Sequence, residues 1–118
     1  MPHFMLQLAY HAHNWEAQLE DPQDRIETVA KPVLEEAGCK LISGWYTFGQ
    51  YDMLLIIEAP DAATVMSIPM AVSAGGALEA DQVTPLLSGP EAVVAMKKAA
   101  KLASVYKPAG GKDRAHGR

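Results

Sequence analysis

The chain has 118 residues, of which 49% are hydrophobic and 20% are charged, and its formal net charge at pH 7 is −4. This length suits one globular domain, and an acidic chain lacks the basic surface that nucleic acid or an anionic membrane requires, so we expect neither partner. The single cysteine, Cys39, excludes an intrachain disulfide. Because there is no signal-peptide pattern and no long apolar segment, we expect a cytoplasmic location.

The first predicted element is a strand at residues 4–10, where every second residue is large and apolar or aromatic. Residues 11–20 are polar and predict a loop or a short helical turn. Asp21 is followed by proline, which is typical of a helix start. The apolar spacing that follows predicts a helix that is kinked at Pro32 and ends at Gly38.

Two strands are predicted at residues 41–48 and 51–58, because both segments are rich in apolar and aromatic residues and only two residues separate them. Gly49 suits the first position of a type II′ turn. In this hairpin Phe48 pairs with Tyr51, and that pairing fixes which residues share a face.

A second helix is predicted from Asp61, a typical N-cap, to about Gly75. Pro69 interrupts this pattern, so we expect a widened turn there. Met66 and Met70 are expected on the face toward the sheet, where methionine commonly fills gaps in a core.

Residues 78–87 predict the last strand, and a proline near its end favours the edge of the sheet. Ser88 begins a typical capping sequence for a C-terminal helix. The elements therefore follow the α+β, ferredoxin-like order β-α-β-β-α-β with an added C-terminal helix. We expect residues 1–106 to form one domain and residues 107–118 a flexible basic C-terminal tail.

One face of the predicted sheet carries apolar side chains that the helices of a two-layer domain do not cover. These side chains are Met5, Leu41, Trp45, Leu54 and Ile56. Leaving one of them in water forgoes roughly 1.5–3 kcal/mol of burial. A second copy of the sheet would cover the face and make a homodimer, which could assemble into a higher oligomer. The alternative cover is the C-terminal helix.

The segment from Trp45 to Leu54, WYTFGQYDML, resembles the signature of the GYD-domain family, with G-Q-Y-D at the turn. The likeness extends from residue 3 to about residue 100. It implies a GYD-like domain that pairs with a second copy as a sheet-to-sheet dimeric α/β barrel. The resemblance implies no settled activity.

The face that would meet the partner mixes polar and apolar side chains, as small-molecule pockets do. The candidate ligand-binding residues are Gln7, Ser43, Trp45, Thr47 and Leu54, and the candidate proton acceptors are Asp52 and His3. For Asp52 a structural role is the alternative, in which its carboxylate ties down the hairpin. Tyr51 is expected on the helix side, as a core aromatic residue.

His11 and His13 are two positions apart, so in an extended segment both imidazoles face the same way. They are candidate ligands for Zn²⁺, Cu²⁺ or haem iron, although a complete site needs three or four ligands and surface histidines are the alternative. The sequence has no phosphate loop, dinucleotide motif or nucleophile elbow, so we expect no cofactor.

Three classes of function remain open. The first, which we favour, is a homodimer that binds a small apolar or aromatic molecule between its sheets. The second is a cofactor-independent enzyme of oxygenase or isomerase type that uses Asp52 or His3 as proton acceptor. The third is a structural or assembly protein whose interior is packed solid.

Overall fold

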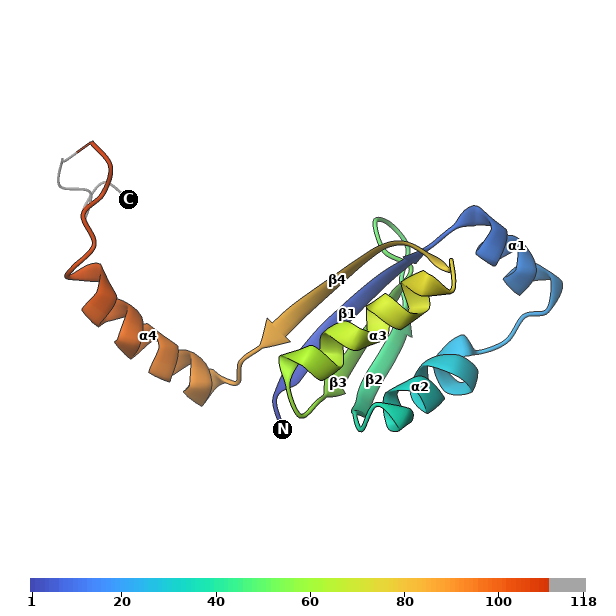
Figure 1. Ribbon diagram of the computed structural model, residues 1–118, viewed down its shortest axis with the longest axis horizontal. Coiled ribbons are helices and arrows are strands. Elements are labelled where there is room, and N and C mark those ends of the chain that lie inside the picture. The colour runs from blue at the N-terminus through green and yellow to red at the C-terminus, as the bar shows by residue number, and fades with distance from the viewer. Residues whose placement is uncertain (111–118) are drawn as a thin grey trace. The chain divides into compact units, whose positions relative to one another are not determined.

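The structure is a computed structural model that describes residues 1–110 (Figure 1). It divides into two compact units, Met1–Leu86 and the segment from Leu87 onward, and each is described by itself. The elements of the first unit are β1 (His3–Tyr10), α1 (Ala12–Glu20), a π-helical turn (Ile26–Ala30), α2 (Lys31–Glu36), β2 (Lys40–Tyr46), β3 (Met53–Glu58), α3 (Ala62–Ala74) and β4 (Leu78–Leu86). The second unit contains α4 (Gly89–Ala103).

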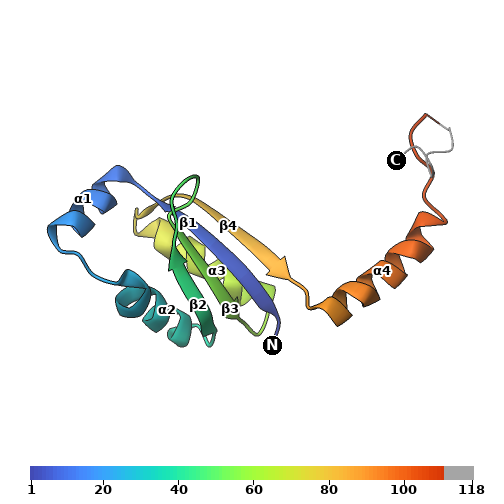
Figure 2. The same ribbon diagram turned by 180° about the vertical axis from the view of Figure 1, so that it is seen from behind.

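The four strands form one antiparallel sheet in the order β2-β3-β1-β4. α2 and α3 lie on the same face of this sheet (Figures 1 and 2). This is the α+β, ferredoxin-like arrangement that the sequence predicts. The core between the layers is formed by Phe4, Leu6, Leu8, Leu34, Cys39, Met53, Leu55, Ile57, Ala59, Val65, Ile68 and Leu78. Burial of each large member contributes about 1.5–3 kcal/mol.

Residues 11–20, expected as a loop or a short turn, form the nine-residue helix α1. Its N-cap residue, His11, makes no capping hydrogen bond through its side chain, so the local start signal is weak. The helix is connected to the sheet through Trp15, whose ring meets that of Tyr10 edge to face with 5.8 Å between centroids. Such an aromatic pair contributes about 0.5–1.5 kcal/mol beyond burial, which compensates for the weak cap.

The next helix begins later than predicted, and Asp21 is not its N-cap. Oδ1 of Asp24 instead accepts a hydrogen bond from the N–H of Ile26 at 3.1 Å. The first turn is π-helical, and the N–H of Lys31 donates to the carbonyl of Ile26. Pro32 follows directly and has no N–H of its own to donate, so the expected kink takes the form of a widened turn.

The pairing of β2 with β3 follows the prediction near the turn and departs from it farther away. Trp45 pairs with Leu54, as predicted, but Leu41 pairs with Ile57 because Ile42 is an extra residue in a β-bulge. The bulge turns Leu41 toward the core rather than the opposite face. It also leaves Ile42 45% exposed.

The predicted two-residue turn is wrong. A loop of six residues, 47–52, joins β2 to β3, and Gly49 within it has a φ of +139°. The side chain of Thr47 closes the loop by donating from Oγ1 to the carbonyl of Tyr51 at 2.7 Å. Phe48, expected to pair with Tyr51 in the core, is 97% exposed.

The ends of several elements agree with the prediction. Gly38, with a φ of +80°, follows the last turn of α2. Asp61 caps α3, since its Oδ1 accepts from the N–H of Thr64 at 2.8 Å. β4 is an edge strand, and Pro85 lies in it without disrupting the sheet.

Helix α3 continues through Pro69 without a break. Val65 and Ile68 are its buried aliphatic residues, and Pro69 is buried with them. The expectation that Met66 and Met70 face the sheet is wrong, because their exposed fractions are 44% and 64%. The helix therefore presents a different stripe of residues to the core than the methionine spacing indicated.

Helix α4 begins as predicted, at a complete capping box. Oγ of Ser88 accepts from the N–H of Glu91 at 3.2 Å, and the Glu91 carboxylate accepts from the N–H of Ser88 at 2.8 Å. None of the residues in α4 is buried. Among residues 1–110, no helix combines the length and apolar composition needed to span a bilayer. The predicted tail, residues 107–118, lies largely outside the described residues.

Candidate functional site

One face of the sheet carries no helix of the first unit, and we call it the open face (Figure 2). Paired residues in an antiparallel sheet point to the same side. The open face therefore includes His3, Met5 and Gln7 of β1, Leu54, Ile56 and Glu58 of β3, Lys40, Ser43 and Trp45 of β2, and Gln82, Thr84 and Leu86 of β4. Its largest side chain, Trp45, is 63% exposed.

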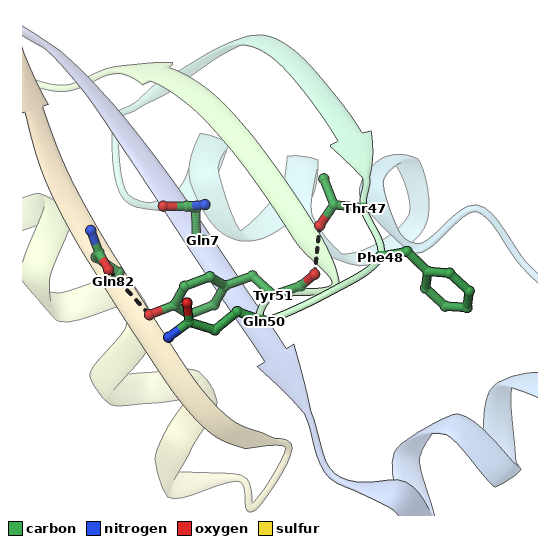
Figure 3. A pocket seen from close by; sticks show the side chains of 6 residues that line it. All are labelled: Gln7, Thr47, Phe48, Gln50, Tyr51 and Gln82. Carbon is green, nitrogen blue, oxygen red and sulfur yellow. Dashed lines mark hydrogen bonds between the residues drawn. The ribbon is translucent and has the colours of Figure 1, made fainter.

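A groove of about 330 Å³ lies where the open face meets the 47–52 loop (Figure 3). It is lined by Gln7, Thr47, Phe48, Gln50, Tyr51 and Gln82. All six are uncharged, and each glutamine amide offers both donors and an acceptor. Such a lining suits a neutral molecule with polar groups better than an ion.

Tyr51 does not lie on the helix side of the sheet, so its expected core position is wrong. Its ring lies across β1 on the open face, and its hydroxyl donates to Oε1 of Gln82 at 3.1 Å (Figure 3). The six-residue loop produces this placement, because Tyr51 is no longer held in the strand alternation that the shorter turn would impose.

The carboxylate of Asp52 is engaged by the backbone of the neighbouring strand. Its Oδ2 accepts from the N–H of Tyr10 at 2.8 Å, and the N–H of Asp52 donates to the carbonyl of Leu8 at 2.7 Å. Hydrogen bonds to a charged group contribute about 1.5–3 kcal/mol. This geometry fits the structural role that the sequence offered as the alternative to catalysis for Asp52, and Asp52 is not among the groove residues.

His3 lies at the other end of β1. Its Nε2 is 3.5 Å from Oε2 of Glu58, the residue that faces it on β3. His3 and Gln7 are four positions apart, which corresponds to about 13 Å along a strand. The structure therefore does not bring His3 to the groove or to Asp52.

The predicted ligand-binding residues fall into two groups. Gln7 and Thr47 line the groove, whereas Ser43, Trp45 and Leu54 belong to the open face beside it. The sequence reasoning missed the remaining groove residues, Phe48, Gln50, Tyr51 and Gln82. Extending the strand alternation to β4 would have placed Gln82 opposite Gln7. Phe48, Gln50 and Tyr51 lie in the 47–52 loop, where no sequence pattern predicts the direction of a side chain.

His11 and His13 lie at the start of α1, not in an extended segment. Their rings are nevertheless stacked, with 5.4 Å between centroids and 17° between planes. Among residues 1–110, no three His, Cys, Asp or Glu side chains are grouped closely enough to hold a metal ion. The two histidines therefore form at most part of a ligand set within this region.

Two protonatable groups near the core keep their protons at neutral pH. Burial raises the pKa of Tyr10, and the neighbouring Tyr46 raises it further, while Arg25 acts in the opposite direction. Burial also raises the pKa of the Cys39 thiol, with a smaller contribution from Asp61. Neither the phenol nor the thiol is thus prepared to act as a base or nucleophile.

A family model described as the GYD domain matches residues 4–105, from the first strand to beyond the end of α4. Comparisons with curated proteins and with solved structures found no match. The family match spans nearly the whole chain and confirms what the Trp45–Leu54 segment indicated. The chain therefore belongs to the GYD-domain family.

Proposed function

We propose that the chain forms a homodimer through the open face and binds a small apolar or aromatic molecule between the two sheets. The observation that carries this proposal is the apolar content of a face without a helix. Trp45 is 63% exposed, and Met5, Leu54 and Ile56 beside it are only half-buried. Full burial of a large apolar side chain contributes roughly 1.5–3 kcal/mol. Covering Trp45 gains most of this amount and covering the other three gains a smaller share each, and a two-fold pairing of identical faces covers all of them.

The groove supports binding of an uncharged molecule in this interior. Phe48 and Tyr51 supply aromatic rings, and Gln7, Gln50 and Gln82 supply amide groups. Aromatic stacking contributes about 0.5–1.5 kcal/mol, and hydrogen bonds strengthen once water is excluded. A partner sheet over the open face would provide that exclusion.

The dimer is tested by using Trp45 as the only tryptophan. In a Trp15→Phe variant, the fluorescence of Trp45 should shift to longer wavelength on dilution, as the side chain returns to water. Sedimentation equilibrium should show dissociation over the same concentration range. The matched control is Trp45→Phe, in which Trp15 should report no such shift. A monomer at all concentrations, with Trp45 emission unchanged, would refute the dimer.

Ligand binding is tested by native mass spectrometry of the purified protein, followed by the same sample denatured. We expect a dimer that carries extra mass, which is released on unfolding. Tyr51→Ala should abolish the extra mass and leave the dimer intact, whereas Ser73→Ala, on α3, should change neither. A bound mass that survives the loss of Tyr51 would place the ligand elsewhere.

A second candidate function is proton-transfer catalysis, and the contact between His3 and Glu58 favours it. A carboxylate 3.5 Å from an imidazole can orient the ring as a base. His3→Gln should then abolish turnover of a bound substrate while leaving its affinity unchanged. Asp52→Asn tests the other candidate acceptor in the same way, and unchanged turnover in both variants would exclude this function.

A further inference from the structure

The two units of the chain carry opposite charge. Residues 1–86 contain 12 acidic and 3 basic residues, a formal charge of −9, whereas residues 87–118 contain 2 acidic and 7 basic residues, a formal charge of +5. The net charge of −4 conceals this asymmetry. Surfaces of opposite charge attract over about 8–10 Å at moderate salt. The C-terminal segment is thus complementary in charge to the unit that precedes it.

Helix α4 also has two chemically different sides. At 100° per residue, Lys97, Lys98 and Lys101 share one side of the helix with Val94, and Met96 and Ala99 lie on the opposite side. Ala92 and Ala103 continue this apolar stripe at the spacing of a packed helix. Met96 is 64% exposed, and no residue of α4 is buried. The stripe is therefore an apolar packing face that the second unit does not itself cover.

An apolar groove of about 320 Å³ lies in the helix layer of the first unit, between α2 and α3. Pro32, Val33 and Ala37 line it on one side, and Ile68 and Ala71 line it on the other. Ile68 is 6% exposed and belongs to the core, so the groove reaches down to that core. Acidic residues adjoin it, because Glu36 is part of the lining and Glu35 precedes it in α2.

We propose that α4 of one chain docks in the α2–α3 groove of a second copy. The apolar stripe faces the groove, and the lysines on the opposite side of α4 stay in solvent, where the basic segment is attracted over a longer range to the acidic first unit. A helix laid by its apolar face into an apolar groove is a recurrent mode of protein recognition. Two copies can exchange their helices reciprocally about a two-fold axis. This contact uses the helix layer and is independent of the open face.

The length of the connecting chain favours a second copy as the occupant. Only Leu87 and Ser88 join β4 to α4, and two residues span at most about 7 Å. β4 and β2 form opposite edges of the sheet, α3 contacts β4, and α2 contacts β2. A helix about 10 Å wide, α3, therefore separates the end of β4 from the groove of the same chain.

The test is a disulfide between two singly substituted chains. One carries Ala71→Cys in the groove and the other Ala99→Cys in the stripe; both positions are exposed. Oxidation of the mixture should link the two chains, because docking brings these positions within disulfide reach. The native Cys39 is 7% exposed and should not compete. In the matched control, Lys101→Cys replaces Ala99→Cys on the opposite side of α4, and its yield should be at least tenfold lower.

Charge is tested by oxidising the mixture in 1 M NaCl, which should reduce the yield several-fold. Three outcomes would overturn the proposal: equal yields for the Lys101→Cys control, no linked chains at all, or a disulfide within one chain when both substitutions are combined. Circular dichroism of each variant verifies that it is folded before oxidation. The shift of Trp45 fluorescence on dilution reports separately on pairing through the open face. Failure of the α4 contact is therefore distinguishable from failure of the open-face dimer.

Discussion

Gly44, on β2, permits the π-helical turn to approach the sheet closely. A Cβ atom at this position would lie 2.8 Å from Cγ2 of Ile26 and 3.1 Å from Cδ2 of Leu55. Carbon atoms in ordinary contact are about 3.5–4.0 Å apart, so Gly44→Ala requires a displacement of about 0.7 Å. Cγ2 of Ile26 is attached to the branched Cβ, so it moves only if χ1 leaves its preferred rotamer or the turn itself shifts.

The cost follows from two opposing terms. Overpacking of this kind lowers stability by about 1–3 kcal/mol, whereas replacing glycine by alanine within a strand raises stability by about 0.5–1 kcal/mol. We therefore expect Gly44→Ala to lower the free energy of unfolding by about 1–2 kcal/mol. Urea denaturation of wild type and variant at one protein concentration measures this difference.

The decisive control is the same substitution in an Ile26→Ala background. Removing Cγ2 and Cδ1 of Ile26 leaves room for the new methyl group. Gly44→Ala should then be neutral or stabilising by up to about 1 kcal/mol. If the substitution costs the same in both backgrounds, the clash with Ile26 is not the cause and the close approach is wrong.

Three further predictions concern individual groups. Asp52→Ala removes the acceptor of the Tyr10 N–H and should destabilise the protein by about 1.5–3 kcal/mol. Asp52→Asn retains a side-chain oxygen and should cost less stability. Equal losses of stability for the two variants in thermal unfolding would contradict the hydrogen bond to Tyr10. The hydrogen bonds from Thr64 hold the pKa of Asp61 below its usual range, so its contribution to stability is present above about pH 4 and is lost as the pH falls through the lowered folded value. Urea titrations between about pH 5 and pH 2 should show a slope of stability against pH that is smaller in Asp61→Asn than in the wild type. Burial raises the pKa of Cys39, so the contribution of its neutral thiol to stability is lost as the pH rises through the raised pKa of the folded state. A thiol reagent at about pH 8 should therefore label Cys39 more slowly in the native chain than in the unfolded chain. Equal labelling rates would refute the burial.

The sequence was most informative where the signal was local. The caps at Asp61 and Ser88, the helix end near Gly38 and the strand alternation in β1 each depend on residues within one or two turns. These signals, in chain order, were enough to predict the ferredoxin-like arrangement and the pairing of Trp45 with Leu54. Membership in the GYD-domain family was indicated by the hairpin segment together with a likeness from residue 3 to about residue 100.

The candidate site depended on features that no local signal carries. The six-residue loop moves Tyr51 from the core to the open face, where its hydroxyl reaches Gln82 on β4. Gln82 lies 31 positions after Tyr51 in the sequence, so only the pairing of β4 with β1 places it in the groove. For this reason the sequence identified the face and two groove residues, Gln7 and Thr47, but not the remainder of the lining.

By itself, the sequence determined the order and type of most elements and the chemical character of the open face, since caps and alternation act through neighbouring residues. Only the tertiary structure decided the bulge at Ile42, the helix at residues 12–20 and the position of Tyr51. Each depends on contacts between distant segments, such as Trp15 against Tyr10. Their energies become available only after the sheet has formed, and they then outweigh weaker local preferences.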